Sequence, residues 1–205
     1  MGASMARRPP ARPGETAATA TWHLGRYHDT TSQDAWDDLR LLPQHIDILR
    51  SRGIHPDVAR ERGYRSVTVI RDAKRVGFAE SQCMLPALLI PLYNVAGEIA
   101  GYQLRPDTPR VRDGKPIKYE SPARSAPQLD CPPRARRWVL DPEQSLVVTE
   151  GSLKADSAAS RDIACLAIAG VWNWRSPDVI AALDQIPLKG RTVYLAFDSD
   201  WRRKP

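Results

Sequence analysis

Three acidic residues follow short apolar stretches in the C-terminal part of the chain. Glu150 comes after LVVT, and Asp198 and Asp200 come after TVYLAF. Such stretches are typical of buried strands in a parallel sheet, and the carboxyl ends of parallel strands meet at one edge. Three carboxylates at one edge repel each other unless a cation lies among them, and oxygen ligands suit Mg²⁺ or Mn²⁺. The sequence therefore predicts a divalent-metal site formed by Glu150, Asp198 and Asp200.

The residues that follow Glu150 could bind a phosphate group. Gly151 permits a tight turn into a helix, which we expect at about residues 152–160. The first backbone N–H groups of a helix are free to bind an anion, and Ser152 and Lys154 lie beside them. The alternative interpretation is an ordinary turn between a strand and a helix, with an exposed glutamate.

The C-terminal elements predict the kind of sheet that positions these residues. Strands and helices are expected to alternate, with strands at 146–149, 163–168 and 192–197 and helices at 152–160 and from about 176. This alternation is typical of an α/β fold with a parallel sheet. The aromatic residues Trp172 and Trp174 lie in the loop after the second strand. They could stack on bases, but packing against the sheet is the favoured expectation.

The preceding part of the chain predicts a different, mixed arrangement. We expect short helices at 42–50 and 56–61, a strand at 64–70, and a hairpin with strands at 87–93 and 98–104. Residues 106–137 are rich in proline and basic side chains. They predict either a long surface loop or a segment that faces nucleic acid.

Three regions follow from these patterns. Residues 1–40 predict a disordered or partly ordered basic tail, residues 41–137 a basic α+β subdomain, and residues 138–205 a partial parallel sheet. Because the chain stops five residues after Asp200, we expect the sheet to be C-terminally truncated.

Composition indicates what kind of partner the protein binds and in which cellular compartment it is expected. The chain has 205 residues and a net charge of +6, from 30 Lys and Arg against 24 Asp and Glu, which favours a polyanionic partner. The three cysteines are odd in number and show no metal-ligand spacing. With no signal peptide and no apolar run of membrane-spanning length, the expectation is a cytoplasmic protein without a membrane partner.

The motifs resemble a known family of domains. The order LVVTEG, helix, strand and VYLAFDSD resembles the topoisomerase–primase (TOPRIM) domain, which places a Glu after its first strand and an Asp-x-Asp after its third. Upstream, LLIPLYNVAGEIAGYQLRP and GKPIKYESP resemble the polymerase domain of bacterial DnaG-type primases. EGSLKAD and GVWNW are most similar to a TOPRIM-like family of unknown function carried by phages, plasmids and integrated elements.

The resemblance implies a fold and a set of roles. It implies a TOPRIM-like parallel sheet preceded by a primase-like subdomain. Glu150, Asp198 and Asp200 match the metal-binding catalytic acids of the family. Arg105 and Lys118 match basic residues that face template or nucleotide phosphates. One position departs from the pattern, because DnaG-type primases carry a second acid four residues after the Glu, where this chain has Lys154.

Three functions remain open from the sequence. The favoured one is primase-like nucleotidyl transfer on single-stranded DNA in mobile-element replication, with nucleoside triphosphates as substrates and Mg²⁺ or Mn²⁺ as cofactor. The second is a DNA-binding replication module without turnover that acts beside a replicative helicase, which Lys154 favours. The third is a TOPRIM nuclease that cleaves DNA phosphodiesters.

Overall fold

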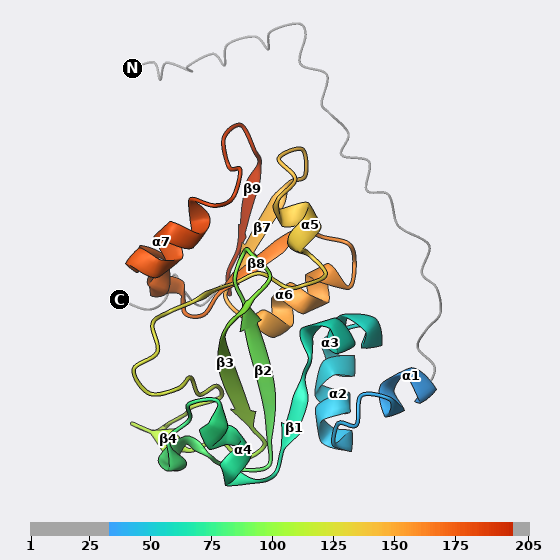
Figure 1. Ribbon diagram of the computed structural model, residues 1–205, viewed down its shortest axis with the longest axis vertical. Helices are drawn as coiled ribbons and strands as arrows, with labels where there is room; N and C mark the ends of the chain where they lie inside the picture. Colours follow the sequence, from blue (N-terminus) through green and yellow to red (C-terminus); the bar gives the residue numbers. More distant parts are fainter. Residues whose placement is uncertain (1–32, 199–205) are drawn as a thin grey trace, which may run out of the picture.

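The computed structural model of the protein describes residues 33–198. Asp200 and residues 1–32 of the predicted N-terminal tail lie outside these residues. The described chain forms an antiparallel sheet and a mainly parallel sheet, which lie one above the other in Figure 1, with helices packed around them. The structure confirms the predicted α/β class, because the second sheet contains the expected parallel strands.

Helices surround the two sheets. All of them are short: the two longest have nine and eight residues, and the second of these connects two parallel strands. The helices are α1 (Gln33–Asp37), α2 (Pro43–Ser51), α3 (Pro56–Arg62), α4 (Ile70–Arg75), α5 (Arg136–Val139), α6 (Ser152–Ala159) and α7 (Pro177–Leu183), with 3₁₀ turns η1 (Glu80–Gln82) and η2 (Val171–Arg175).

The local signals at the ends of these helices explain their bounds. Both α2 and α3 begin at a proline, whose fixed φ suits the first turn of a helix. His55 caps α3 by accepting a hydrogen bond from the backbone N–H of Asp57, and Gly63 ends the helix in a left-handed conformation. Ser176 caps α7 in the same way as His55, through the N–H of Val179. These helices were predicted at nearly the observed positions. The strand expected at 64–70 is shorter, at Arg65–Val67, and α4, which was not predicted, begins at Ile70.

The antiparallel sheet is built on the predicted hairpin. Its strand order is β1-β2-β3, with β1 at Arg65–Val67, β2 at Ala87–Tyr93 and β3 at Ile99–Pro106. β2 is buried along nearly its whole length, since it is the central strand and packs on both faces. In Figure 1 the arrow of β3 points away from the parallel sheet, towards α4 and the small hairpin that contains β4.

The second sheet has the order β6-β8-β7-β9. Its strands are β6 (Leu129–Asp130), β7 (Leu146–Thr149), β8 (Cys165–Ile168) and β9 (Val193–Ala196). β7 pairs in parallel with both β8 and β9, while β6 joins β8 in the antiparallel direction. The two predicted acid-bearing strands are therefore direct neighbours.

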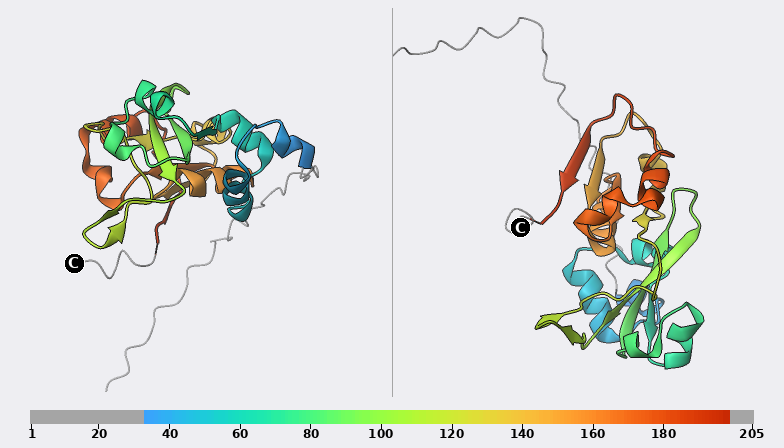
Figure 2. Two further views of the ribbon diagram at one scale, coloured as in Figure 1. Left: turned by 90° about the horizontal axis from the view of Figure 1, so that it is seen from below. Right: turned by 90° about the vertical axis from the view of Figure 1, so that its left-hand side faces the viewer.

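The burial of β9 differs from the prediction. The apolar pattern of residues 192–197 predicted a buried strand, but Val193, Tyr194 and Leu195 are 40%, 52% and 70% exposed. Figure 2 shows β9 at the outer side of the sheet, where only β7 flanks it. The prediction was wrong because β9 is an edge strand in the described chain, and an apolar pattern alone does not say whether both faces of a strand are covered.

The proline-rich segment 106–137 is more ordered than the prediction of a long loop. It contains the exposed hairpin of β4 (Val111–Arg112) and β5 (Lys115–Pro116), then β6 and the start of α5. Glu120 anchors the segment to β3 through backbone hydrogen bonds with Leu104 in both directions. Its buried carboxylate accepts two hydrogen bonds from Arg110.

One buried apolar cluster reaches both sheets. It includes Leu49 of α2, Ile90 of β2, Val148 of β7 and Leu166 of β8. The division into subdomains at about residue 137 stays a prediction; β6, which lies before that boundary, pairs with β8, which lies after it. In the described chain no helix has both the length and the apolar character to cross a membrane.

Candidate functional site at the carboxyl edge of the parallel sheet

Two of the three predicted acids lie at one edge of the sheet. Thr149 of β7 and Ala196 of β9 are paired in parallel register, and the Thr149 hydroxyl donates a hydrogen bond to the Ala196 carbonyl at 2.9 Å. Glu150 follows the first strand directly, and Asp198 comes two residues after the second. The parallel pairing therefore brings both carboxylates to the same edge, as the sequence predicted.

The Lys154 ammonium lies between these carboxylates. Its Nζ donates to Oε1 of Glu150 at 2.6 Å and also to Oδ1 of Asp198. The side chains of Lys154 and Glu150 are 33% and 25% exposed, whereas that of Asp198 is 62% exposed. The cluster is thus open to solvent on the Asp198 side.

Hydrogen bonding favours the charged forms of Lys154 and Asp198. Partial burial lowers the pKa of Lys154, but its hydrogen bonds to Asp198 and Glu150 outweigh burial, so the pKa lies above its ordinary value. The pKa of Asp198 lies below its ordinary value because of hydrogen bonding with Glu150 and Lys154, with Lys154 and Arg52 also acting through their positive charge. The Lys154 ammonium and the Asp198 carboxylate are therefore both suited to bind charged groups at neutral pH.

The two carboxylates have the donor chemistry that a divalent cation requires. They converge on a single cationic atom, and each offers oxygen ligands of the kind that Mg²⁺ prefers. The predicted third ligand, Asp200, lies outside the described residues. Within residues 33–198, no three His, Cys, Asp or Glu side chains are grouped to hold a metal ion. In the described structure the cation between the acids is Lys154.

A buried charge cluster fixes the helix that carries Lys154. Arg62 of α3 donates from Nε and Nη2 to the carboxylate of Asp156 on α6, and from Nη1 to Asp130 of β6 at 2.5 Å. Tyr64 also donates to Asp156, at 2.5 Å. Burial lowers the pKa of Arg62, but the charges of Asp130 and Asp156 raise it by a larger amount. The pKa therefore lies well above its ordinary value, and the guanidinium stays charged.

Sequence reasoning missed this cluster. Arg62 and Asp156 lie 94 residues apart, and each occurs in a helix where a charged residue is normally solvent-exposed. One weak signal was present in the sequence. Asp156 lies among the small residues of α6, and small residues are typical of a helix face that packs closely against a neighbour. The cluster matters to the site because it fixes α6 two residues after Lys154.

The remaining predicted phosphate ligands differ in their surroundings. Ser152 is 5% exposed at the start of α6, so its hydroxyl is buried. Arg105 is half-buried in β3, and Lys118 is exposed after β5. In the described part of the chain, no hydrogen bond or ion pair joins Arg105 or Lys118 to the acidic residues. The structure thus brings Lys154 to Glu150 and Asp198, whereas phosphate binding by these residues stays a prediction.

The two tryptophans of the loop after β8 are exposed. Trp172 and Trp174 are 63% and 48% exposed, so the expectation that they pack against the sheet was wrong. The Arg175 guanidinium lies over both rings, 5.9 Å from the centroid of Trp172 and 5.0 Å from that of Trp174. Both rings belong to a 3₁₀ turn of five residues that leads directly into α7.

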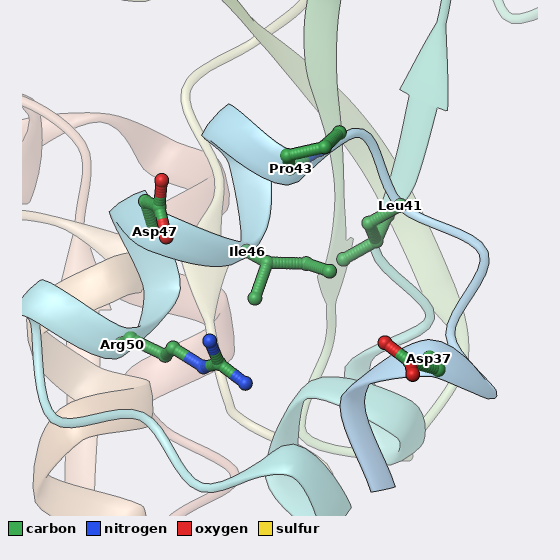
Figure 3. Close-up of a pocket in the computed structure, with 6 residues that line it drawn as sticks. All are labelled: Asp37, Leu41, Pro43, Ile46, Asp47 and Arg50. Atoms are coloured by element: carbon green, nitrogen blue, oxygen red, sulfur yellow. The ribbon is translucent and has the colours of Figure 1, made fainter. Parts of the chain in front are cut away.

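Cavities occur elsewhere on the molecule. One of about 260 Å³ lies between α1 and α2 and is lined by Asp37, Leu41, Pro43, Ile46, Asp47 and Arg50. Figure 3 shows Ile46 and Arg50 of α2 and Asp37 of α1 around the space between these helices. A second, of about 510 Å³, is lined by Glu61, Pro133, Arg134 and Arg137. Neither cavity is lined by a predicted site residue, so the candidate site is the open acidic edge.

The comparisons with known proteins agree with this architecture. The family model described as "Domain of unknown function (DUF3854)" matches residues 136–205. No curated protein sequence matches the chain significantly. The chain is similar in structure to the Aquifex aeolicus primase, with its zinc-binding and RNA polymerase domains, at 19% identity and a TM-score of 0.52. This similarity covers 80% of the chain and 47% of that primase structure.

Two further solved structures show the same fold. The RNA polymerase domain of Mycobacterium tuberculosis primase DnaG is 18% identical with a TM-score of 0.52, covering 78% of this chain and 60% of that one. A DnaG primase catalytic domain bound to single-stranded DNA is 17% identical with a TM-score of 0.54, covering 82% and 61%. The chain therefore has a primase-like α/β fold, and it spans about half to three fifths of these structures.

Proposed function

We propose that this chain is a primase-like domain that binds single-stranded DNA and carries out divalent-metal-dependent nucleotidyl transfer. The observation that carries the proposal is the convergence of Glu150 and Asp198 at the carboxyl edge of a parallel sheet, within a primase-like fold. We further propose that this sheet is a TOPRIM domain, with Asp200 as the third acid, and that the chain serves mobile-element replication beside a helicase.

In this proposal the residues of the chain bind and orient the reactants. A bound Mg²⁺ or Mn²⁺ ion would reduce the charge on the phosphates of the incoming nucleotide. Glu150 and Asp198 would position that ion, and Arg105 and Lys118 would bind template or nucleotide phosphates. The 3′-oxygen of the primer forms a bond to the α-phosphorus, pyrophosphate leaves, and the hydroxyl proton passes to solvent.

A second candidate function is a DNA-binding module without turnover. The observation that favours it is the Lys154 ammonium, which already pairs with both acids in the described structure and offsets part of their charge. In this case the fold and the net positive charge would serve DNA binding, while the acidic edge would be structural.

One assay distinguishes these functions. The protein is incubated with single-stranded DNA and labelled ribonucleotides, with Mg²⁺ or Mn²⁺ and with EDTA as the metal-free control. Metal-dependent primer synthesis is the expected result. Shortened DNA without nucleotide incorporation would instead identify a nuclease, and DNA binding without any product would identify the binding module.

The exposed tryptophans provide a prediction about DNA binding. Replacing Trp172 and Trp174 together with alanine is expected to weaken binding of a fluorescent oligo-dT by roughly tenfold or more, since each base–aromatic stack contributes about 1–3 kcal/mol. Fluorescence anisotropy at one fixed salt concentration measures the affinity. Ile180→Ala, which removes a 45% exposed apolar side chain from α7, is the control. Equal affinities of the double variant and the control would show that the tryptophans do not contact DNA.

A further inference from the structure

The Lys154 ammonium occupies the position in which a metal ion would contact both carboxylates. Its Nζ is a hydrogen-bond donor to both Glu150 and Asp198, at 2.6 Å from the Glu150 oxygen. Mg²⁺ requires oxygen ligands at about 2.0–2.1 Å in an octahedral arrangement. An ammonium and a divalent ion cannot both lie within ligand distance of the same two oxygens, because of their size and their like charge.

Lys154 is also restricted in where it can move. Its side chain starts from α6, and the buried ion pairs of Asp156, two residues further on, hold that helix against α3. The backbone of Lys154 is therefore fixed, and only its flexible side chain can leave the carboxylates. The 62% exposure of the Asp198 side chain leaves an open route for the ammonium to turn into solvent.

We propose that Lys154 is an internal counter-ion of the acidic edge, which a divalent metal ion must displace before it binds Glu150 and Asp198. This inference rests on the proposed function, because it concerns the metal site of that function. It implies that the repulsion between the two acids is reduced without a metal ion, which stabilises the metal-free form of the site. It also implies that metal binding is weaker than the carboxylates alone would allow.

The proposal is tested directly by measuring metal binding in variants that replace a lysine with an uncharged side chain. Lys154→Met keeps the length and the apolar part of the side chain and removes the ammonium. We expect it to bind Mn²⁺ roughly tenfold more tightly than the unmodified chain, because two ion pairs no longer compete with the metal. Isothermal titration calorimetry, or electron paramagnetic resonance of free Mn²⁺, measures this affinity without requiring activity.

Lys189→Met is the matched control. Lys189 is exposed and forms no ion pair in the described structure, and its replacement changes the net charge of the protein by the same amount. An unchanged Mn²⁺ affinity in this variant would exclude a general effect of charge. An unchanged or weaker affinity in Lys154→Met would overturn the proposal.

The reactivity of the amine provides a second measurement. If Mg²⁺ displaces Lys154, the amine loses its hydrogen bonds, and acetylation of Lys154 by an amine-reactive ester should increase several-fold on addition of Mg²⁺. Mass spectrometry quantifies this relative to Lys189 in the same sample. Labelling of Lys154 that does not respond to Mg²⁺, in a protein that binds the metal, would contradict displacement.

The failure of this proposal is distinguishable from failure of the proposed function. Tighter Mn²⁺ binding by Lys154→Met with no primer synthesis by either protein would support the counter-ion and reject nucleotidyl transfer. Metal-dependent primer synthesis with equal Mn²⁺ affinity in both proteins would do the reverse.

Discussion

Replacing Arg62 with methionine is expected to lower the free energy of unfolding by about 3–5 kcal/mol, because it leaves buried carboxylates without their counter-ion. Arg62 and Asp156 are fully buried, and Asp130 is 2% exposed. Asp130 already has one carboxylate oxygen, Oδ2, that is buried without a hydrogen-bond partner within the described chain. Since domains are typically stable by only about 5–15 kcal/mol, the variant should unfold at a much lower urea concentration.

Arg60→Met provides the control for this prediction. Arg60 lies on the same helix, but its side chain is 47% exposed and pairs with Asp57 at the surface. Exposed ion pairs contribute about 0.2–1 kcal/mol, so this variant should change stability little. Urea unfolding followed by circular dichroism gives both values. If the two variants lost the same stability, the buried cluster would not be a major support of the fold.

The buried charge cluster also connects the antiparallel sheet to the candidate site on the parallel sheet. It joins α3, whose Arg62 also donates a hydrogen bond to the Pro91 carbonyl of β2, to α6, which carries Lys154 at the edge of the parallel sheet. A carboxylate buried in this position costs free energy unless a guanidinium meets it with good geometry. The requirement therefore fixes the angle of α6, and with it the position of Lys154 between the acids.

Features with local signals could be predicted from the sequence. A proline in the first turn and a glycine after the last turn define α3, and the same reasoning located α2. The alternation of apolar strands and helices after residue 138 predicted the parallel sheet, and its polarity placed Glu150 and Asp198 at one edge. These predictions succeeded because periodicity and helix caps depend on residues that are close in the sequence.

Features that depend on distant contacts could not be predicted. The apolar pattern of β9 gave no information about its neighbours, so its exposure was unexpected. His45 of α2 is fully buried, and its two ring nitrogens are hydrogen-bonded to Ser66 and Asp107, which lie 21 and 62 residues away in the sequence. Lys154 was expected to bind phosphate, and only the fold shows that its ammonium reaches Asp198, 44 residues away.

The acidic edge provides the second large prediction. Glu150→Gln is expected to reduce primer synthesis by roughly 100-fold or more, because the amide has nearly the shape of the carboxylate but no charge to hold a cation opposite the phosphates. Stability should change little, since the Glu150 side chain is 25% exposed and its ion pair with Lys154 lies near the surface. Incorporation of labelled ribonucleotide per unit time, at saturating Mg²⁺ and single-stranded DNA, measures the rate.

Glu143→Gln is the matched control for that variant, because Glu143 is exposed three residues before β7 and undergoes the same chemical change. It should retain the rate of the unmodified chain. Mn²⁺ affinity, measured on the same proteins, then separates two explanations of a slow Glu150→Gln variant. Weaker Mn²⁺ binding would place Glu150 among the metal ligands, whereas unchanged binding would show that the carboxylate acts in the reaction without binding the metal ion. A Glu150→Gln variant as fast as Glu143→Gln would show that nucleotidyl transfer does not take place at this edge of the sheet.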